Sequence, residues 1–176
     1  LETQGGRDSR VSDLMTLLKP YKLDGLYGKY FNLPSSIDPT AQLVVLELGG
    51  IEGNSDLLQP VLFSLINTIS QKMYLSDRSL RKLCVIDEAW ALLSGDNPMA
   101  ASFIEKGFRT SRKHGGSFVT ITQSIEDYYQ DECAKACWTN SDIKIIMRQN
   151  DEALKAFMAR NTSHFSDYEL RILRQF

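Results

Sequence analysis

Short apolar segments alternate with longer stretches of helical periodicity in this chain, and that alternation constrains the fold more than any other feature. Each segment is a run of β-branched and other apolar residues without regular polar alternation, which is typical of a strand buried on both faces. The predicted strands cover residues 43–48, 83–87, 118–122 and 143–147.

Between and after these strands, apolar residues recur at three- and four-residue spacing, which predicts helices. The predicted helices cover residues 55–74, 98–114, 152–159 and 166–173. Strands that alternate with helices indicate an α/β fold with a mainly parallel sheet flanked by helices.

The first part of the chain has a different pattern. Residues 8–19 predict a helix that ends before Pro20, and residues 21–40 predict a loop rich in aromatic side chains. We therefore expect residues 1–40 to form a helix and an aromatic loop that pack on the core. Residues 41–176 are expected to form the α/β domain, and a chain of 176 residues has the length of one domain.

Charge and cysteine content exclude several classes of protein. With 20 Lys and Arg against 22 Asp and Glu, the chain is not a generally basic nucleic-acid binder, although a local basic patch is compatible with this balance. No apolar run approaches the ~18 residues of a membrane span.

Three cysteines do not form a disulfide framework, which indicates a reducing compartment. Cys133 and Cys137 are four residues apart, but with both histidines distant we interpret them as buried small residues rather than zinc ligands.

Asp87 and Glu88 follow the strand at residues 83–87 directly and are the strongest candidate for a chemical site. Ligands of open α/β folds bind at the carboxyl ends of parallel strands. An aspartate there can hold Mg²⁺ beside a nucleotide, and a glutamate immediately after it can deprotonate a water molecule. The alternative is a pair of solvated carboxylates where a strand runs out into water.

Gln123 occupies the corresponding place after the next strand, at residues 118–122, where a polar side chain can sense a γ-phosphate or position water. The intervening helix ends in a basic stretch that includes Arg109, Arg112 and Lys113. These cations can simply complement the helix carboxyl terminus. They can also contact a phosphate, in the same subunit or in a neighbour.

Several longer segments resemble one family. They are CVIDEAWALL, FRTSRKHGGSFVTITQS and CWTNSDIKIIMRQ, preceded by GLYGKYFN and LVVLELGGIEGNSDLLQPVLFSLINTISQKMY. Together they resemble the TraC-type, VirB-class ATPases of conjugative type IV secretion systems, which are more distantly similar to the HerA and FtsK motors. The resemblance covers nearly the whole chain and implies a RecA-like P-loop NTPase fold that hydrolyses ATP with Mg²⁺.

The resemblance also implies roles for individual residues. Asp87 and Glu88 correspond to the Walker B pair, so that Asp87 holds Mg²⁺ and Glu88 activates water. Gln123 corresponds to the glutamine at the tip of the next strand. Arg112 and Lys113 match a basic motif that acts between subunits, and Arg109 is a further candidate for nucleotide contact.

Proteins of this family resemble homo-oligomeric, hexameric motors. They are cytoplasmic, associate peripherally with the inner membrane, and work with other secretion components to assemble pili. Two alternatives remain: a HerA- or FtsK-like DNA pump, and a non-catalytic interaction module. The chain shows no strong sign of direct nucleic-acid binding.

The family's P-loop, G-x-x-x-x-G-K-[ST], does not occur in this chain. Its only Gly-Lys pair, Gly28-Lys29, is followed by Tyr30. We therefore expect the chain to be the carboxyl-terminal part of an ATPase, with an incomplete RecA-like sheet that lacks the P-loop strand and with no nucleotide bound on its own. The missing P-loop strand would leave a gap between the strands at residues 118–122 and 143–147, and we expect this gap to close or fill. Residues 43–48, 83–87 and 118–122 should form a contiguous parallel core with Asp87 and Gln123 at one edge.

Overall fold

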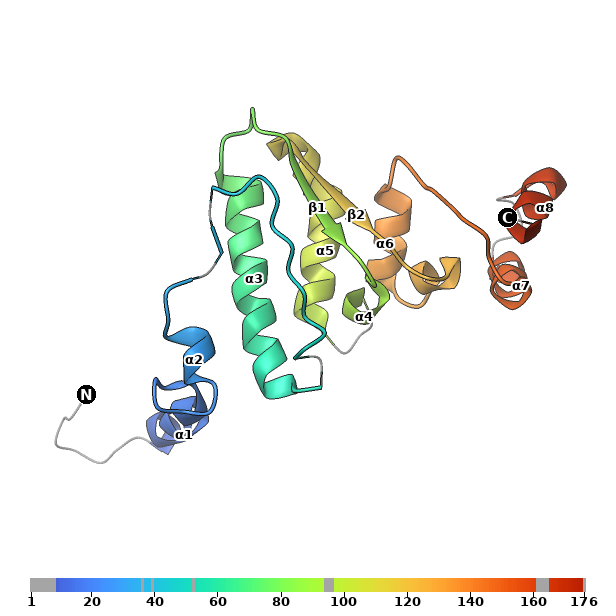
Figure 1. The fold of residues 1–176 in the computed structure, drawn as a ribbon. Helices are drawn as coiled ribbons and strands as arrows, with labels where there is room; N and C mark the ends of the chain where they lie inside the picture. Colours follow the sequence, from blue (N-terminus) through green and yellow to red (C-terminus); the bar gives the residue numbers. More distant parts are fainter. Residues whose placement is uncertain are drawn as a thin grey trace. The chain divides into compact units, whose positions relative to one another are not determined.

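A computed structural model describes residues 9–35, 37–38, 40–51, 53–93, 97–160 and 165–175. The chain divides into two compact units, residues 1–59 and 60–176 (Figure 1). Helix α3 (Ser55–Leu75) begins in the first unit and continues into the second. The division predicted after residue 40 stays a prediction.

The first unit contains helix α1 (Ser9–Leu18), the 3₁₀ turn η1 (Lys19–Tyr21) and the short helix α2 (Gly28–Phe31). The rings of Tyr21 and Tyr27 lie 5.4 Å apart, and those of Tyr21 and Phe31 lie 5.5 Å apart. The aromatic residues of the predicted loop therefore pack against one another, and α2 forms within that segment.

The second unit is built on two parallel strands, β1 (Lys82–Ile86) and β2 (Gly116–Thr120), with Lys82 opposite Gly116 and Ile86 opposite Thr120. They confirm the strands predicted at residues 83–87 and 118–122, displaced by one or two residues. Burial alternates along both strands. Phe118 is buried, whereas Leu83 and Val119 are exposed. The prediction that the strands are buried on both faces was therefore wrong, because one face of this sheet is open.

Helix α5 (Pro98–Thr110) packs against β2 on the covered face (Figure 1). Gly107 makes the close approach possible, because a Cβ atom there would lie 2.5 Å from the Phe118 ring. Asn97 caps α5 by accepting a hydrogen bond from Ala100 N at 3.1 Å. The 3₁₀ turn η2 (Ser111–His114) continues α5, which confirms the helix predicted over residues 98–114 apart from its tighter last turn.

Five shorter elements complete the described part of this unit. Helix α4 (Trp90–Leu93), the 3₁₀ turn η3 (Ile125–Tyr129) and helix α6 (Glu132–Asn140) were not predicted, whereas α7 (Asp151–Arg160) and α8 (Asp167–Gln175) confirm the last two predicted helices. Ala89, Ile104, Ala134 and Cys137 form the buried core between α4, α5 and α6. Phe157 extends the packing from α7 to Tyr129, with ring centroids 5.3 Å apart.

The predictions for residues 43–48 and 143–147 were wrong: neither stretch forms a strand, and the sheet in the described ranges has two strands. Leu43 and Val45 are each 80% exposed, and Ile145 is 87% exposed. Because residues 143–147 form no strand, the described ranges contain no gap between two flanking strands, and the three-stranded core does not form. Apolar β-branched residues favour a strand only where a neighbouring strand supplies hydrogen-bonding partners for the backbone.

No described helix has the combination of length and apolar character that crossing a membrane requires.

Candidate functional site

The two residues after β1 place carboxylates at the carboxyl edge of the sheet, which we define as residues 87–89 together with residues 121–123. Asp87 and Glu88 are both exposed. Glu88 has a φ angle of +50°, in the left-handed region, and is the one non-glycine residue with positive φ within the described ranges. Its N–H donates to Asp87 Oδ1 at 3.0 Å. Such a backbone conformation is unfavourable for a residue with a Cβ atom and is concentrated at functional sites.

Backbone pairing continues past the ends of the strands and brings this carboxyl edge together. Ile121 N donates to Ile86 O at 2.9 Å, and Ala89 N donates to Ile121 O at 3.0 Å. The chain after β1 thus stays in register with the chain after β2. This pairing confirms the prediction that the two strands are neighbours and deliver their polar residues to one edge.

Gln123 contacts the glutamate directly. Its Nε2 atom donates a hydrogen bond of 2.9 Å to Glu88 Oε1, although 35 residues separate them in the sequence. The contact orients the Glu88 carboxylate while leaving it open to solvent. A carboxylate held in this way can accept a proton from a water molecule positioned beside it.

Asp127 adds a third carboxylate that our sequence analysis missed. It belongs to the capping box of η3, in which its Oδ2 accepts from Ser124 N at 3.2 Å and Ser124 Oγ accepts from Glu126 N. Burial raises the pKa of Asp127 and the charge of Glu88 raises it further, against the Ser124 hydrogen bond, which lowers it. The Ser-x-x-Asp spacing after a strand is a capping-box pattern and could have revealed this residue.

The donors at this edge fit Mg²⁺ only in part. In the described part of the chain, no group of three or more acidic, histidine or cysteine side chains is arranged to hold a metal ion. Magnesium characteristically takes one or two protein carboxylates and fills its remaining positions with phosphate oxygens and water. The exposed Asp87 carboxylate can supply one such ligand once a nucleotide provides the others.

Gly28-Lys29 does not provide a phosphate cradle. A Cβ atom at Gly28 would lie 2.1 Å from Lys22 O, so the glycine serves close backbone packing. Its N–H donates to Gly25 O at 3.0 Å and is not available to a phosphate.

The basic candidates lie at the other end of the strands. Arg112 and Lys113 are exposed on η2, which leads into the beginning of β2. Lys82 N at the start of β1 donates to Gly115 O at 3.0 Å, which fixes η2 at the amino edge of the sheet. Five strand residues at roughly 3.3 Å each separate the two edges by about 16 Å. The structure therefore does not bring Arg112 or Lys113 to Glu88 and Gln123.

Arg109 is likewise remote from the carboxyl edge. It lies in the last turn of α5 and forms an ion pair of 2.8 Å with Glu105, four residues earlier. Glu105 also accepts a hydrogen bond from Cys133 Sγ at 3.4 Å. These contacts account for Arg109 as part of the packing between α5 and α6.

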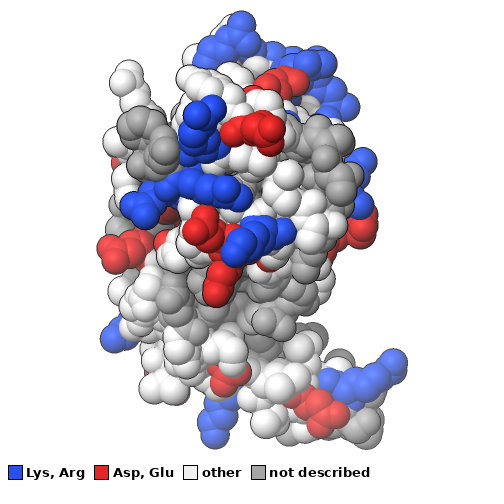
Figure 2. All heavy atoms as spheres, turned by 90° about the vertical axis from the view of Figure 1, so that its right-hand side faces the viewer, with Lys and Arg blue, Asp and Glu red and all other residues white. Residues whose placement is uncertain are grey.

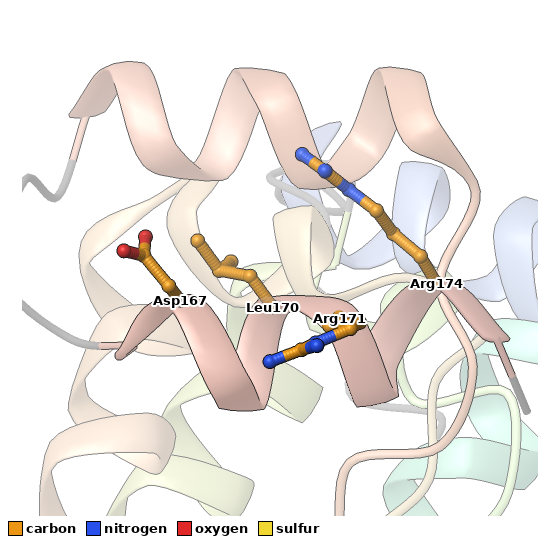
Figure 3. Close-up of a pocket in the computed structure, with 4 residues that line it drawn as sticks. All are labelled: Asp167, Leu170, Arg171 and Arg174. Carbon is orange, nitrogen blue, oxygen red and sulfur yellow. The ribbon is translucent and has the colours of Figure 1, made fainter.

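An open depression on α8 is separate from all of these residues. Asp167, Leu170, Arg171 and Arg174 line it, and three of their side chains rise from one face of the helix (Figure 3). Arg174 also pairs with Asp151 of α7 at 3.5 Å. None of the predicted site residues lines this depression, so it is not the site at the carboxyl edge.

A parallel strand pair with carboxylates and a glutamine at its carboxyl edge fits a P-loop NTPase domain, and comparison with known proteins agrees. The model of the TraG P-loop domain family matches residues 2–174, and the chain belongs to that family. Among individual proteins, it is 47% identical over 146 residues to protein TraC of Escherichia coli strain K12. That alignment covers 81% of this chain and 17% of the relative.

The fold agrees with a solved structure as well. VirB4 of Thermoanaerobacter pseudethanolicus superimposes with a TM-score of 0.64 at 21% identity, covering 95% of this chain and 44% of that one. These matches confirm the RecA-like fold class and the TraC-type resemblance. The chain thus spans less than half the length of either relative.

Proposed function

We propose that this chain supplies the Walker B half of the nucleotide site in a motor ATPase of a conjugative type IV secretion system. The observation that carries the proposal is the hydrogen bond from Gln123 to Glu88, made between the loops that follow two paired parallel strands. Membership of the TraG P-loop domain family and similarity to protein TraC support it.

Three residues at the carboxyl edge have distinct parts in this proposal. Asp87 would hold Mg²⁺ together with nucleotide oxygens, and Glu88 would accept the proton of the attacking water. Gln123 holds the Glu88 carboxylate and is placed to register the state of the γ-phosphate. Mg-ATP, when bound, supplies the phosphoryl group and the positive charge beside Asp87.

The basic residues act across a subunit interface in this proposal. Because Arg112 and Lys113 lie at the amino edge, about 16 Å from the carboxyl edge of the same sheet, they can reach a nucleotide only in a neighbouring subunit. This arrangement fits a head-to-tail homo-oligomer, in which η2 of one copy faces the carboxyl edge of the next. We infer a hexamer by resemblance to the family.

The cellular setting follows the same resemblance. We infer a motor at the cytoplasmic face of the inner membrane that works with other secretion components in pilus assembly and plasmid transfer. Hydrolysis stimulated by DNA would favour the alternative of a DNA pump. Absence of any Mg-ATP hydrolysis would favour an interaction module.

The test uses a polypeptide that contains this chain together with a P-loop segment, which we call the extended protein. Glu88→Gln should retain ATP binding and lose turnover by roughly 10²- to 10⁴-fold, the usual contribution of a general base. Glu132→Gln, which changes an exposed glutamate on α6, is the matched control and should hydrolyse ATP at the original rate. Wild-type turnover by Glu88→Gln would remove Glu88 from the mechanism.

A further inference from the structure

The turn that connects α3 to β1 concentrates positive charge at the amino edge of the sheet. We call residues 76–82 the basic turn; it carries Arg78, Arg81 and Lys82. The adjoining η2 adds Arg112 and Lys113, so these two segments hold five cations and one acidic residue in a chain whose net charge is −2. Figure 2 shows Lys and Arg side chains gathered at the top of the view, the end at which this turn lies in Figure 1.

The basic turn and η2 form one continuous surface because Gly115 lets them approach closely. Gly115 has a φ angle of +71°, and a Cβ atom there would lie 2.6 Å from Arg78 O and 2.9 Å from Leu80 O. Burial lowers the pKa of the adjoining His114, and the charges of Arg78, Lys113 and Lys82 lower it further. The cations of both segments therefore surround the same histidine.

Hydrogen bonds within the basic turn fix its shape. Ser79 N donates to Asp77 Oδ1 at 2.9 Å, and this contact contributes to lowering the pKa of Asp77. Lys82 Nζ donates to Asp77 O and to Ser76 Oγ, both at 3.1 Å. The only acidic side chain of the turn and one of its cations are thus engaged internally, and the tip presents Arg78, Leu80 and Arg81 to solvent.

Exposed leucines distinguish this surface from an ordinary basic patch. Leu80, between Arg78 and Arg81, is 58% exposed, and Leu75 at the end of α3 is 81% exposed. A phosphodiester backbone offers nothing to a leucine side chain, and the described residues of the turn include no aromatic ring on which a base could stack. A bilayer surface accommodates both kinds of side chain, because anionic headgroups attract cations and the interface takes up apolar groups.

We propose that the basic turn binds the surface of an anionic lipid bilayer, with Leu80 entering the interface and Arg78 and Arg81 facing the headgroups. The surface lies at the edge of the sheet opposite Glu88 and Gln123, so the proposal does not depend on nucleotide hydrolysis. Arg112 and Lys113, assigned above to a neighbouring nucleotide, are not required for it. The chain itself, and not only its secretion partners, would then contact the membrane.

Vesicle co-sedimentation of the 176-residue chain tests the proposal. The chain should bind vesicles of phosphatidylcholine with phosphatidylglycerol, and not vesicles of phosphatidylcholine alone. Binding should decrease as salt is raised from about 0.1 M to 1 M, because the screening length falls from ~10 Å to ~3 Å. No binding to the anionic vesicles, or equal binding to both kinds, would overturn the proposal.

Two variants and a matched control locate the surface. Removing the charges with Arg78→Gln and Arg81→Gln together should weaken binding about 25-fold, at about fivefold for each cation. Lys135→Gln with Lys155→Gln, exposed lysines on α6 and α7, changes the net charge equally and should leave binding unchanged. Leu80→Ser should weaken binding several-fold without changing the charge. Circular dichroism confirms that each variant is folded.

A short single-stranded oligonucleotide separates the lipid surface from a nucleic-acid site. The proposal expects the oligonucleotide to bind weakly and Leu80→Ser to leave that binding unchanged, while vesicle binding falls. If the oligonucleotide displaces the vesicles completely and Leu80→Ser has no effect on vesicle binding, the basic turn is a nucleic-acid site and the lipid proposal is wrong. Equal losses of vesicle binding in the double variant of Arg78 and Arg81 and in the double variant of Lys135 and Lys155 would also contradict the lipid proposal.

Discussion

Gln123 donates a hydrogen bond of 2.9 Å to Glu88 and so joins the loops that follow β1 and β2. The two side chains lie in segments that follow different strands, and Glu88 is held in a left-handed backbone conformation beside Asp87. The contact shows that residues far apart in the sequence meet at the carboxyl edge, where P-loop NTPases bind nucleotide.

Gly107→Ala should destabilise the second unit. The added Cβ atom would lie 2.5 Å from the Phe118 ring, and relieving that overlap requires the buried ring to shift or α5 and β2 to move apart. Overpacking of this kind typically costs about 1–3 kcal/mol of unfolding free energy. Urea unfolding measures the change. Gly49→Ala is the control, since nothing lies within 4 Å of its Cβ position, and a loss as large in Gly49→Ala would contradict the packing argument.

His114 should make stability depend on pH. Burial and the neighbouring cations lower its pKa below the usual value, so below about pH 6.5 the unfolded chain binds a proton more readily than the folded one. Stability should therefore fall as the pH drops below that value. The measurement compares the unfolding midpoints at pH 7.5 and pH 5.5. The decrease in stability between these two pH values should be smaller in His114→Gln than in the original protein, because the contribution of His114 is removed. An equal loss in both proteins would show that His114 does not contribute.

The three free cysteines should react at different rates. Burial raises the pKa of Cys84 to about 11 and that of Cys137 to about 12, so at pH 8 roughly one in 10³ and one in 10⁴ molecules carries the thiolate. Burial also raises the pKa of Cys133, but to a smaller extent. Alkylation followed by peptide mass spectrometry should modify Cys133 first and Cys137 last. Rapid labelling of Cys137 in the folded chain would contradict its burial.

Arg112→Ala in the extended protein should impair hydrolysis, because an arginine that stabilises transition-state charge contributes roughly 10³- to 10⁵-fold in rate. Its position at the amino edge predicts an effect in trans. Mixing Arg112→Ala with Glu88→Gln subunits should restore part of the activity at interfaces that pair an intact Arg112 with an intact Glu88. Lys155→Ala is the matched control. Full activity of Arg112→Ala alone would contradict the assignment.

The sequence predicted an element correctly where its local pattern was sufficient, and failed where the element also depends on a neighbour. β1 and β2 were placed within two residues, since each is a compact apolar run next to helices of clear periodicity. Residues 43–48 and 143–147 have the same local character but form no strand, because a strand also needs a hydrogen-bonded neighbour that composition does not specify. The open face of the sheet, with Leu83 and Val119 exposed, was missed for the same reason.

The candidate site was predicted in part. Adjacent carboxylates after β1 and a glutamine after β2 indicated a shared edge, and the pairing of the two strands confirms it. The direct contact of Gln123 with Glu88 depends on backbone pairing that continues past both strands, which no sequence pattern encodes. Asp127 was missed, although its spacing from Ser124 is that of a capping box.

The central claim is that Glu88 and Gln123 act as one unit in hydrolysis, and a double-mutant cycle on the turnover of the extended protein tests it most directly. Glu88→Gln, Gln123→Ala and the double variant are compared at saturating Mg-ATP. If Gln123 acts by holding the Glu88 carboxylate, removing it should cost less than the roughly 10²-fold or more expected for Glu88→Gln, and the double variant should be no slower than Glu88→Gln alone. Losses that multiply in the double variant would show that the two residues act independently and would contradict the account.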